Sequence, residues 1–397
     1  MEKPAICGGT PVRSTPLAYG HQYIDDEDIR AVTETLQSEC LTCGPRTREL
    51  ESMLCRITGA KYCVAVSNGT AALHIAALAA GIGPGDEVIT SPITFAASAN
   101  CALYCGAKPV FADIRPDTYN IDPASIRACI TPRTKAVVAV DFTGQAVELD
   151  EIRAICREHR LTLIEDAAHS IGTRYKGQPI GSLADMTTFS FHPVKTVTAG
   201  EGGAVTTDSR ELYDKLGLLH AHGITRDRSQ MVHPTDDPWY NEQAAFGFNY
   251  RMTEIQAALL LSQLNKLERF SRRRKEIVAR YDAAFSRIPQ LQVQREIPAS
   301  DTTRHLYILR LRSEMLRCTR REFFDALGAE GIHSQVHYLP VYWHSYYDSL
   351  GYEKGLCPQA ERYYREAMSL PLYYSLTDRD VEDVIHIVEK LINYYAK

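Results

Sequence analysis

The feature that most constrains the fold is a regular alternation of short apolar segments and helical segments between residues 61 and 166. The apolar segments are continuous rather than alternating, which is typical of strands covered by helices on both faces. Strands separated by helices form a mainly parallel sheet. We therefore expect an α/β fold with strands at 62–67, 87–91, 108–113, 135–141, 161–166 and 186–191, and helices at 70–80, 95–105, 123–128 and 149–159.

The rest of the chain divides around this core. Residues 1–24 contain several prolines and glycines and predict an irregular N-terminal arm. Residues 25–270 are predicted to form the large domain, and residues 271–397 a smaller C-terminal α/β domain. Outside the alternating region we expect helices at 25–38, 45–58, 253–286, 320–327 and 378–395, and strands at 306–311 and 333–338.

Composition excludes several classes of protein. The net charge of -5 provides no basic surface for nucleic acid. The eleven cysteines follow no signal peptide, which predicts a cytoplasmic protein with reduced thiols. Cys40 and Cys43 form a CxxC pair without a second pair at usable spacing, so we expect no metal site. The apolar stretch 71–82 is too short to span a bilayer, and we expect no membrane association.

The chain is organised around residues 185–205, DMTTFSFHPVKTVTAGEGGAV, which predict a buried strand, a turn and a hairpin of small residues. Lys195 lies in that turn. An amine held away from water loses part of its charge and can form a Schiff base with a carbonyl. The alternative is an ordinary surface lysine, since lysine is mostly exposed.

Two strand ends resemble binding sites for a phosphate and a ring nitrogen. Gly69 and Thr70 begin a helix directly after a strand, where free amides and a hydroxyl suit a phosphate. Asp166 ends another strand, where a carboxylate can pair with a protonated ring nitrogen, and His169 follows it. Helix capping by Thr70 or Asp166 and a satisfied core histidine are the alternatives.

Three further residues complete the pattern. Phe95 follows a strand and offers an aromatic face for a flat cofactor, although it can equally be core. Ser190 precedes Lys195 by five residues and is placed to add a hydroxyl to the phosphate. Asn249 precedes the helix at 253–286, where it can also be a turn residue. The first strand lacks a G-x-G-x-x-G turn, which argues against a nicotinamide cofactor. Together these residues favour pyridoxal 5′-phosphate (PLP).

Five motifs carry a resemblance that covers nearly the whole chain: SNGTAAL, DEVITSPITFAASANC, LIEDAAHSIG, FSFHPVKTVTAGEGGAV and GFNYRMTEIQAAL. They resemble the DegT/DnrJ/EryC1/StrS family of sugar aminotransferases, which have the PLP-dependent transferase fold of type I with a seven-stranded sheet. The resemblance implies that Lys195 is the catalytic Schiff-base lysine and that Asp166 pairs with the ring nitrogen. It implies that the cofactor is further held by Gly69, Thr70, Phe95, His169, Ser190 and, from the neighbouring subunit of a homodimer, Asn249.

Within the family the chain looks most like members that act in pseudaminic acid biosynthesis. Such a resemblance implies transfer of an amino group from L-glutamate to C4 of a UDP-linked 4-keto-6-deoxy-N-acetylhexosamine. Ile308 and the triplet 68–70 depart from the related pattern, which has a proline and serine-alanine-threonine there, so the choice of sugar stays open. The nucleotide-sugar site would be lined by Tyr19, Leu41, Thr42, His305, Leu306, Tyr307 and Ile308.

Three alternatives remain. The acceptor can be another nucleotide-linked 4-keto sugar, such as a UDP-4-keto-pentose or a dTDP-4-keto-6-deoxyhexose. Sugar 3-dehydration uses histidine in place of the lysine in this family, and Lys195 argues against it. A non-catalytic PLP-binding regulator would bring a DNA-binding segment, and the sequence shows no basic helix-turn-helix.

Overall fold

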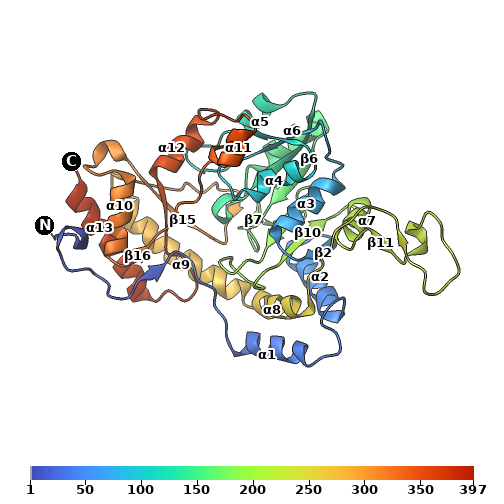
Figure 1. Ribbon diagram of the computed structural model, residues 1–397. Coiled ribbons are helices and arrows are strands. Elements are labelled where there is room, and N and C mark those ends of the chain that lie inside the picture. Colours follow the sequence, from blue (N-terminus) through green and yellow to red (C-terminus); the bar gives the residue numbers. More distant parts are fainter. Residues whose placement is uncertain (1) are drawn as a thin grey trace.

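The computed structural model describes residues 2–397, and its largest element is a seven-stranded sheet in the order β2-β10-β9-β6-β5-β3-β4 (Figure 1). Neighbouring strands from β9 to β4 pair in parallel, whereas β10 pairs antiparallel with both β9 and β2. The expected α/β fold with a mainly parallel sheet is confirmed. The strands are β2 (Tyr62–Val66), β3 (Glu87–Thr90), β4 (Lys108–Phe111), β5 (Thr134–Val140), β6 (Thr162–Asp166), β9 (Met186–Ser190) and β10 (Gly203–Thr207).

Helices cover both faces of this sheet, as the continuous apolar strands require. Along β2, Val64 and Val66 pack against one group of helices, and Cys63 and Ala65 against the other, because successive strand side chains point to opposite faces. The first group consists of α3 (Gly69–Ala79), α4 (Ala97–Tyr104) and α7 (Arg210–Leu219). The second consists of α2 (Pro45–Thr58), α5 (Pro123–Cys129), α6 (Leu149–His159) and α8 (Glu254–Leu264).

A second core lies in the C-terminal unit, which is built on a three-stranded antiparallel sheet. Its strands are β13 (Leu291–Val293), β15 (Tyr307–Leu311) and β17 (Ala367–Leu370). Helix α9 (Leu267–Phe285) joins the two units: Leu267 and Phe270 pack into the large core, and Tyr281 and Phe285 into the C-terminal core. The other helices of this unit are α10 (Arg320–Ala329), α11 (Ser345–Ser349), α12 (Pro358–Glu366) and α13 (Asp378–Tyr395).

The N-terminal arm is more ordered than expected. Its strand β1 (Leu17–Ala18) pairs in parallel with β16 (Ile332–His333), which attaches the arm to the C-terminal unit, and α1 (Asp26–Leu36) follows. A hairpin arm formed by β11 (Ile224–Thr225) and β12 (Glu242–Gln243) projects from the body (Figure 1). The remaining short elements are strands β7 (Arg174–Tyr175), β8 (Gln178–Pro179) and β14 (Ser300–Asp301), and 3-10 helices η1 (Ala5–Cys7), η2 (Phe142–Gly144), η3 (Arg228–Gln230), η4 (Ser313–Met315) and η5 (Val341–Trp343).

The expected single helix over 253–286 is wrong, because the chain breaks between α8 and α9 at Asn265 and Lys266. The break brings the Lys266 ammonium to the carboxylates of Asp25 and Asp28, with 2.9 Å between Lys266 Nζ and Asp28 Oδ2. A buried ammonium needs such partners, so this ion-pair cluster outweighs the apolar periodicity that predicted one helix.

Two other boundaries also differ. The expected strand 333–338 forms a strand only at Ile332–His333, and the chain then turns so that His337 and Tyr338 reach the main cavity. The expected helix 95–105 begins at Ala97, which leaves Phe95 outside the helix and 63% exposed. No helix within residues 2–397 is long and apolar enough to cross a membrane.

Candidate active site

The loops that follow β2, β3, β6 and β9 meet at one edge of the sheet and line a cavity of about 640 Å³. The carboxyl ends of parallel strands gather at this edge, which is where ligands bind in open α/β sheets. The C-terminal unit adds His337 and Tyr338, and the N-terminal arm adds Tyr19. Seven predicted cofactor residues line this cavity: Gly69, Thr70, Phe95, Asp166, His169, Ser190 and Lys195.

Lys195 lies in the turn after β9, where its backbone amide donates to the carbonyl of His192 (2.9 Å). Burial lowers the pKa of the Lys195 amine to about 8, against the attraction of the Asp166 carboxylate, which raises it. The ordinary pKa of lysine is about 10.4. The amine therefore releases its proton near physiological pH, which a nucleophile or a proton carrier requires.

Asp166 ends β6 and is 4% exposed. Its Oδ2 accepts a hydrogen bond from Ser98 Oγ (2.6 Å), and its Oδ1 accepts one from the amide of Ala168 (3.1 Å). Burial raises the pKa of Asp166, whereas both hydrogen bonds and the Lys195 charge lower it. The two donors hold the carboxylate in one orientation, and a buried carboxylate favours a cation opposite it.

Ser98 is a residue that sequence reasoning missed. It lies in α4, and its hydroxyl also contacts Thr94 Oγ1 at 2.7 Å. Thr94, Ser98 and Asp166 thus form a buried chain of hydrogen-bonding groups. Ser98 comes four residues after Thr94, in the same motif as Phe95. The sequence shows that Ser98 is near Phe95, but no sequence rule links its hydroxyl to Asp166.

Two further carboxyls lie behind this site. Asp141 and Glu165 are both fully buried. Asp141 also accepts from Ser170 Oγ (2.7 Å), and Glu165 accepts from Thr187 Oγ1 (3.1 Å). Burial raises the pKa of Asp141 to about 7 and that of Glu165 well above its usual range. Burial therefore favours the protonated form of Glu165 at neutral pH.

The start of α3 forms a cup with Ser190. Asn68 caps the helix by accepting from the amide of Ala71 (2.8 Å), and the first amides of a helix lack partners within it. A Cβ at Gly69 would lie 2.8 Å from Ser190 Cβ, so only glycine lets the two segments approach this closely. Amides, the Thr70 hydroxyl and the Ser190 hydroxyl together suit a phosphate group.

Aromatic groups surround the space between this cup and Asp166. Phe95 exposes its ring, with its centroid 6.5 Å from that of Tyr338. The buried Nδ1 of His169 has no hydrogen-bond partner among the described residues. Burial lowers the pKa of His169 well below its usual range, so its ring stays neutral. His337 is also held neutral: burial lowers its pKa to about 4, and its Nδ1 lies 2.7 Å from Ser369 Oγ.

These features fit PLP in chemistry and in shape. The space between Gly69 and Ser190 has no room for a side chain at position 69, and it offers hydrogen-bond donors to a phosphate group. The oriented carboxylate of Asp166 suits a protonated ring nitrogen, and the orphaned Nδ1 of His169 suits a polar ring substituent. The Lys195 amine with its lowered pKa is the nucleophile for an aldehyde.

Most of the other predicted residues lie outside the cavity. Asn249 is exposed and forms an isolated antiparallel β-bridge with Ala221, outside the cavity of its own chain. Leu41 and Thr42 are exposed on the loop between α1 and α2 and also lie outside it. Of the seven residues predicted for the nucleotide sugar, Tyr19 alone lines the cavity.

Residues 305–308, predicted to line the nucleotide-sugar site, lie outside this cavity. Leu306 and Ile308 are buried in a hydrophobic cluster, and the Tyr307 hydroxyl donates to Asp282 Oδ1 (2.9 Å) within the C-terminal unit. His305 is buried behind His169, with a distance of 4.4 Å between the ring centroids. Strand β15 is a central strand with both faces covered, so its side chains serve packing.

The fold and the cavity define a PLP-dependent transferase of fold type I. Residues 22–389 match the DegT/DnrJ/EryC1/StrS aminotransferase family, and the chain belongs to that family. It is therefore a PLP-dependent sugar aminotransferase that acts on a nucleotide sugar.

Relatives align over almost the whole chain. The spore coat polysaccharide biosynthesis protein SpsC of Bacillus subtilis is 44% identical over 378 residues, which cover 95% of this chain and 97% of SpsC. The UDP-4-amino-4,6-dideoxy-N-acetyl-beta-L-altrosamine transaminase of Campylobacter jejuni is 38% identical over 387 residues, covering 96% and 100%. The structure of Helicobacter pylori PseC, an aminotransferase involved in the biosynthesis of pseudoaminic acid, superposes with a TM-score of 0.88 at 33% identity, covering 96% and 100%.

Proposed function

We propose that this enzyme transfers the amino group of L-glutamate to C4 of UDP-2-acetamido-2,6-dideoxy-β-L-arabino-hex-4-ulose, giving UDP-4-amino-4,6-dideoxy-N-acetyl-β-L-altrosamine. The observation that carries the transamination chemistry is the pairing of a partly neutral Lys195 amine with the oriented Asp166 carboxylate in one cavity. The choice of acceptor is supported by the similarity to the Campylobacter jejuni transaminase and to Helicobacter pylori PseC.

When bound, the cofactor supplies an aldehyde for the amino group and an electron sink for the electron pair released at the reacting carbon. With the cofactor bound, Lys195 Nζ would hold its aldehyde group. The same Nζ, as a free amine, would carry a proton from the α-carbon of glutamate to the cofactor in the first half-reaction, and from the cofactor to C4 of the sugar in the second. A pKa of about 8 suits both directions of that transfer.

The other residues of the cavity hold and orient the cofactor. Asp166, fixed by Ser98 and the Ala168 amide, keeps a proton on the ring nitrogen opposite it. Gly69, Thr70 and Ser190 hold the phosphate, and Phe95 covers one face of the ring. His169, kept neutral by burial, offers its free Nδ1 to a ring substituent.

We also propose that the enzyme acts as a homodimer with shared active sites. Asn249 is exposed and lies outside the cavity of its own chain, which agrees with a role in the cavity of a neighbouring subunit. Tyr19 of the same chain would contact the nucleotide sugar from the cavity wall, and Leu41 and Thr42 remain predicted contacts.

A second acceptor class has independent support. SpsC aligns at higher identity than the Campylobacter jejuni transaminase, and it is a protein of spore coat polysaccharide biosynthesis. The enzyme can therefore act on another nucleotide-linked 4-keto sugar, such as a UDP-4-keto-pentose or a dTDP-4-keto-6-deoxyhexose.

An acceptor panel separates these proposals. The PLP-loaded enzyme is given L-glutamate and each keto sugar in turn, and the amino sugar and 2-oxoglutarate are quantified by mass spectrometry. We expect kcat/KM for the UDP-linked 4-keto-6-deoxy-N-acetylhexosamine to exceed that for the other acceptors at least about 10-fold. A higher value for the pentose or the dTDP sugar would overturn the proposed acceptor, and no 2-oxoglutarate with any of them would overturn the choice of donor.

A further inference from the structure

His305 was predicted to contact the nucleotide sugar, and it lies instead behind His169, outside the lining of the cofactor cavity. The Nδ1 of His169 is buried and has no hydrogen-bond partner within residues 2–397. The orientation of the His169 ring therefore depends on packing. Of the rings around it, that of His305 is the nearest, with 4.4 Å between the centroids, against 6.1 Å for Phe142 and 6.5 Å for Tyr338.

The backbone around this contact has an uncommon conformation. The amide of His305 donates to the carbonyl of Thr143 in η2 at 2.8 Å. Thr143 and Arg304, the residue before His305, both have a positive φ, of 65° and 57°. Residues other than glycine seldom adopt this left-handed conformation, and it persists where the surrounding structure imposes it, commonly at functional sites. The fold thus sustains local strain on both sides of the hydrogen bond that holds His305.

Gly144 lets the two histidine segments come together. Its φ is +98°, and a Cβ on this residue would lie 2.9 Å from the carbonyl oxygen of His169 and 3.1 Å from the amide nitrogen of His305. A residue with a side chain would push the two segments apart, and it would be strained at this φ. The sequence at position 144 therefore permits the close approach of His169 and His305.

A buried arginine holds the other side of His305. Arg274, in α9, is 2% exposed, and its Nη1 donates to the carbonyls of Leu372 (2.8 Å) and His305 (3.2 Å). Burial lowers the pKa of Arg274 to about 10, so the guanidinium keeps its charge at neutral pH. A charge is costly to bury. Here it fixes the backbone of His305 and places a positive charge behind the two imidazole rings.

The groups around the two rings disfavour a proton on either of them. On the cavity side the pair faces Lys195, His337 and Tyr338, and on the side of α9 it faces Arg274. At neutral pH these groups are cationic or neutral. Burial and the neighbouring charges hold the pKa of both imidazoles well below the usual range, so the two rings stay in contact without mutual repulsion.

We propose that His305 is a positioning residue for the cofactor and acts through His169. Its ring, fixed by Thr143, Gly144 and Arg274, holds the imidazole of His169 in one orientation and keeps water away from it. A ring that is already ordered costs less to bring to a bound group. This inference rests on the role of His169 toward PLP proposed above, and it does not depend on which acceptor the enzyme aminates.

The visible spectrum of the PLP-loaded enzyme between about pH 5.5 and 8.5 tests this role. In His305→Ala water reaches His169, whose pKa should return toward the ordinary value of about 6.5. The visible band should then show an added titration step between about pH 6 and 7 that the wild type lacks. His305→Phe keeps a ring against His169 and should behave like the wild type. The control His74→Ala removes a buried histidine that does not line the cavity, and it should also leave the band unchanged.

PLP titration of the cofactor-free variants gives a second readout. Loss of the ordered ring should weaken PLP binding roughly 3- to 10-fold in His305→Ala at pH 8. In a His169→Gln background the same substitution should change neither the PLP affinity nor the spectrum, because the residue through which His305 acts is gone. His305→Gln, which also lacks a ring, should give the same results if circular dichroism shows that His305→Ala does not fold.

A spectrum like that of the wild type at every pH in His305→Ala and His305→Gln would overturn the inference. An equal loss of PLP affinity with and without the imidazole of His169 would also overturn it, since His305 would then act by another route. Both outcomes leave the role of His169 intact. Wild-type PLP affinity and spectrum in His169→Gln alone would instead contradict the role of His169, and this inference with it.

Discussion

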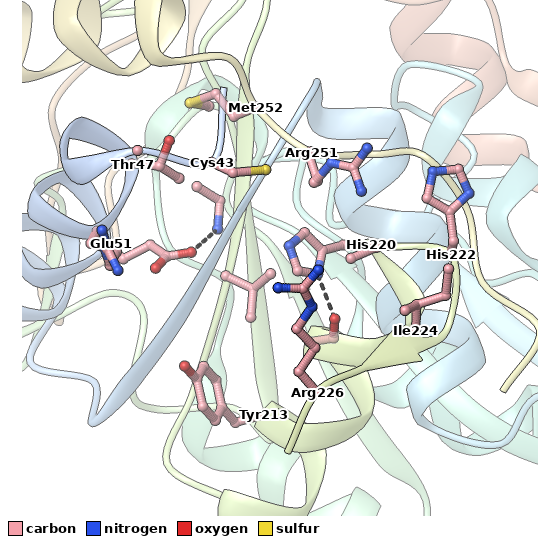
Figure 2. A pocket seen from close by; sticks show the side chains of 16 residues that line it. Cys43, Thr47, Glu51, Tyr213, His220, His222, Ile224, Arg226, Arg251 and Met252 are labelled. Atoms are coloured by element: carbon pink, nitrogen blue, oxygen red, sulfur yellow. Dashed lines mark hydrogen bonds between the residues drawn. The ribbon is translucent and has the colours of Figure 1, made fainter. Parts of the chain in front are cut away.

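The cofactor cavity and a second cavity, of about 470 Å³ beside the edge strand β2 (Figure 2), use charge in opposite ways. In the cofactor cavity the buried charged groups face partners: Asp166 has Ser98, the Ala168 amide and Lys195. We call the second cavity the arginine pocket, because it is lined by Arg48, Arg226 and Arg251. In the arginine pocket the guanidinium groups are partly exposed and form no ion pair within residues 2–397.

The difference teaches how burial decides function. Burial moves the pKa of Lys195 to about 8 and keeps the rings of His169 and His337 neutral, so the cofactor cavity is suited to proton transfer. The arginines keep their charge because guanidinium does not titrate in proteins, so they stay cationic at any physiological pH. Substitutions in the cofactor cavity should therefore change chemistry far more than substitutions of single exposed charges.

The largest effect is expected from Lys195→Arg. This variant keeps the positive charge but removes the amine, so both the nucleophile and the proton carrier are lost. We expect kcat for transamination to fall at least about 10³-fold. The assay measures 2-oxoglutarate formation from L-glutamate with saturating acceptor, with the exposed Lys61→Arg as control. Turnover near the wild-type rate would contradict the role of Lys195.

Asp166→Asn should have the next largest effect. The amide cannot keep the ring nitrogen protonated, and removing one partner of a buried charge pair costs about 3 kcal/mol or more, roughly 100-fold in rate. We expect kcat to fall by that factor while KM for the nucleotide sugar changes little. Steady-state kinetics beside the exposed control Asp348→Asn decide the point. A change confined to KM would instead place Asp166 in sugar binding.

Ser98→Ala tests a positioning residue. Loss of its hydrogen bond frees Asp166 Oδ2 and, for a bond to a charged group, costs about 1.5–3 kcal/mol. We expect kcat to fall about 10-fold, with an altered pH profile because the pKa of Asp166 rises when this donor is lost. Ser98→Thr should restore part of the rate. An unchanged pH profile would show that Ser98 only packs.

Two glycines sharpen the comparison of the cavities. A Cβ at Gly69 meets Ser190 at 2.8 Å, whereas a Cβ at Gly217, in the arginine pocket, meets nothing within 4 Å. Gly69→Ala should lose about 1–3 kcal/mol of stability and bind PLP more weakly. Gly217→Ala lies inside α7 and should gain up to about 1 kcal/mol. Urea unfolding and PLP titration measure both, and equal effects would contradict the proposed cup.

The smallest expected effect is a pH dependence of stability from Asp141 and Glu165. Their folded-state pKa values are raised, so between about pH 4 and 7 the folded protein binds more protons than the unfolded chain. This contribution to stability is complete below the unfolded pKa and is lost as the pH rises through 7. Glu165→Gln should reduce the loss between pH 5 and 7.5 by about 1 kcal/mol in urea unfolding. The exposed Glu39→Gln should leave it unchanged, and identical slopes for both variants would contradict the raised pKa of Glu165.

The parallel sheet could be predicted from sequence because its strands are buried on both faces and its connections are helical. The positions of Lys195, Asp166, Gly69 and Ser190 at one edge follow from the same topology, since each lies at the end of a strand or in the loop that follows one. Each strand end can be recognised locally in the sequence, and a parallel sheet brings these ends together at one edge. The break between α8 and α9 was not predictable in this way, because it depends on Lys266 meeting Asp25 and Asp28, which lie far away in sequence.

The contacts of the C-terminal unit show where sequence reasoning ended. His337 and Tyr338 reach the cavity because the chain leaves β16 after two residues, although the alternating pattern predicted a longer strand. Residues 305–308 were predicted to line the nucleotide-sugar site, yet their side chains are buried in the chain itself. The arginine pocket was hidden because Arg48, Arg226 and Arg251 come from three separate segments.

The visible absorbance spectrum of the purified, PLP-loaded enzyme during titration with L-glutamate tests the central claim most directly. The account predicts a yellow protein whose visible band disappears with stoichiometric release of 2-oxoglutarate and returns when the UDP-linked 4-keto-6-deoxy-N-acetylhexosamine is added. A protein that remains colourless with added PLP, or a yellow band that is indifferent to L-glutamate, would contradict it.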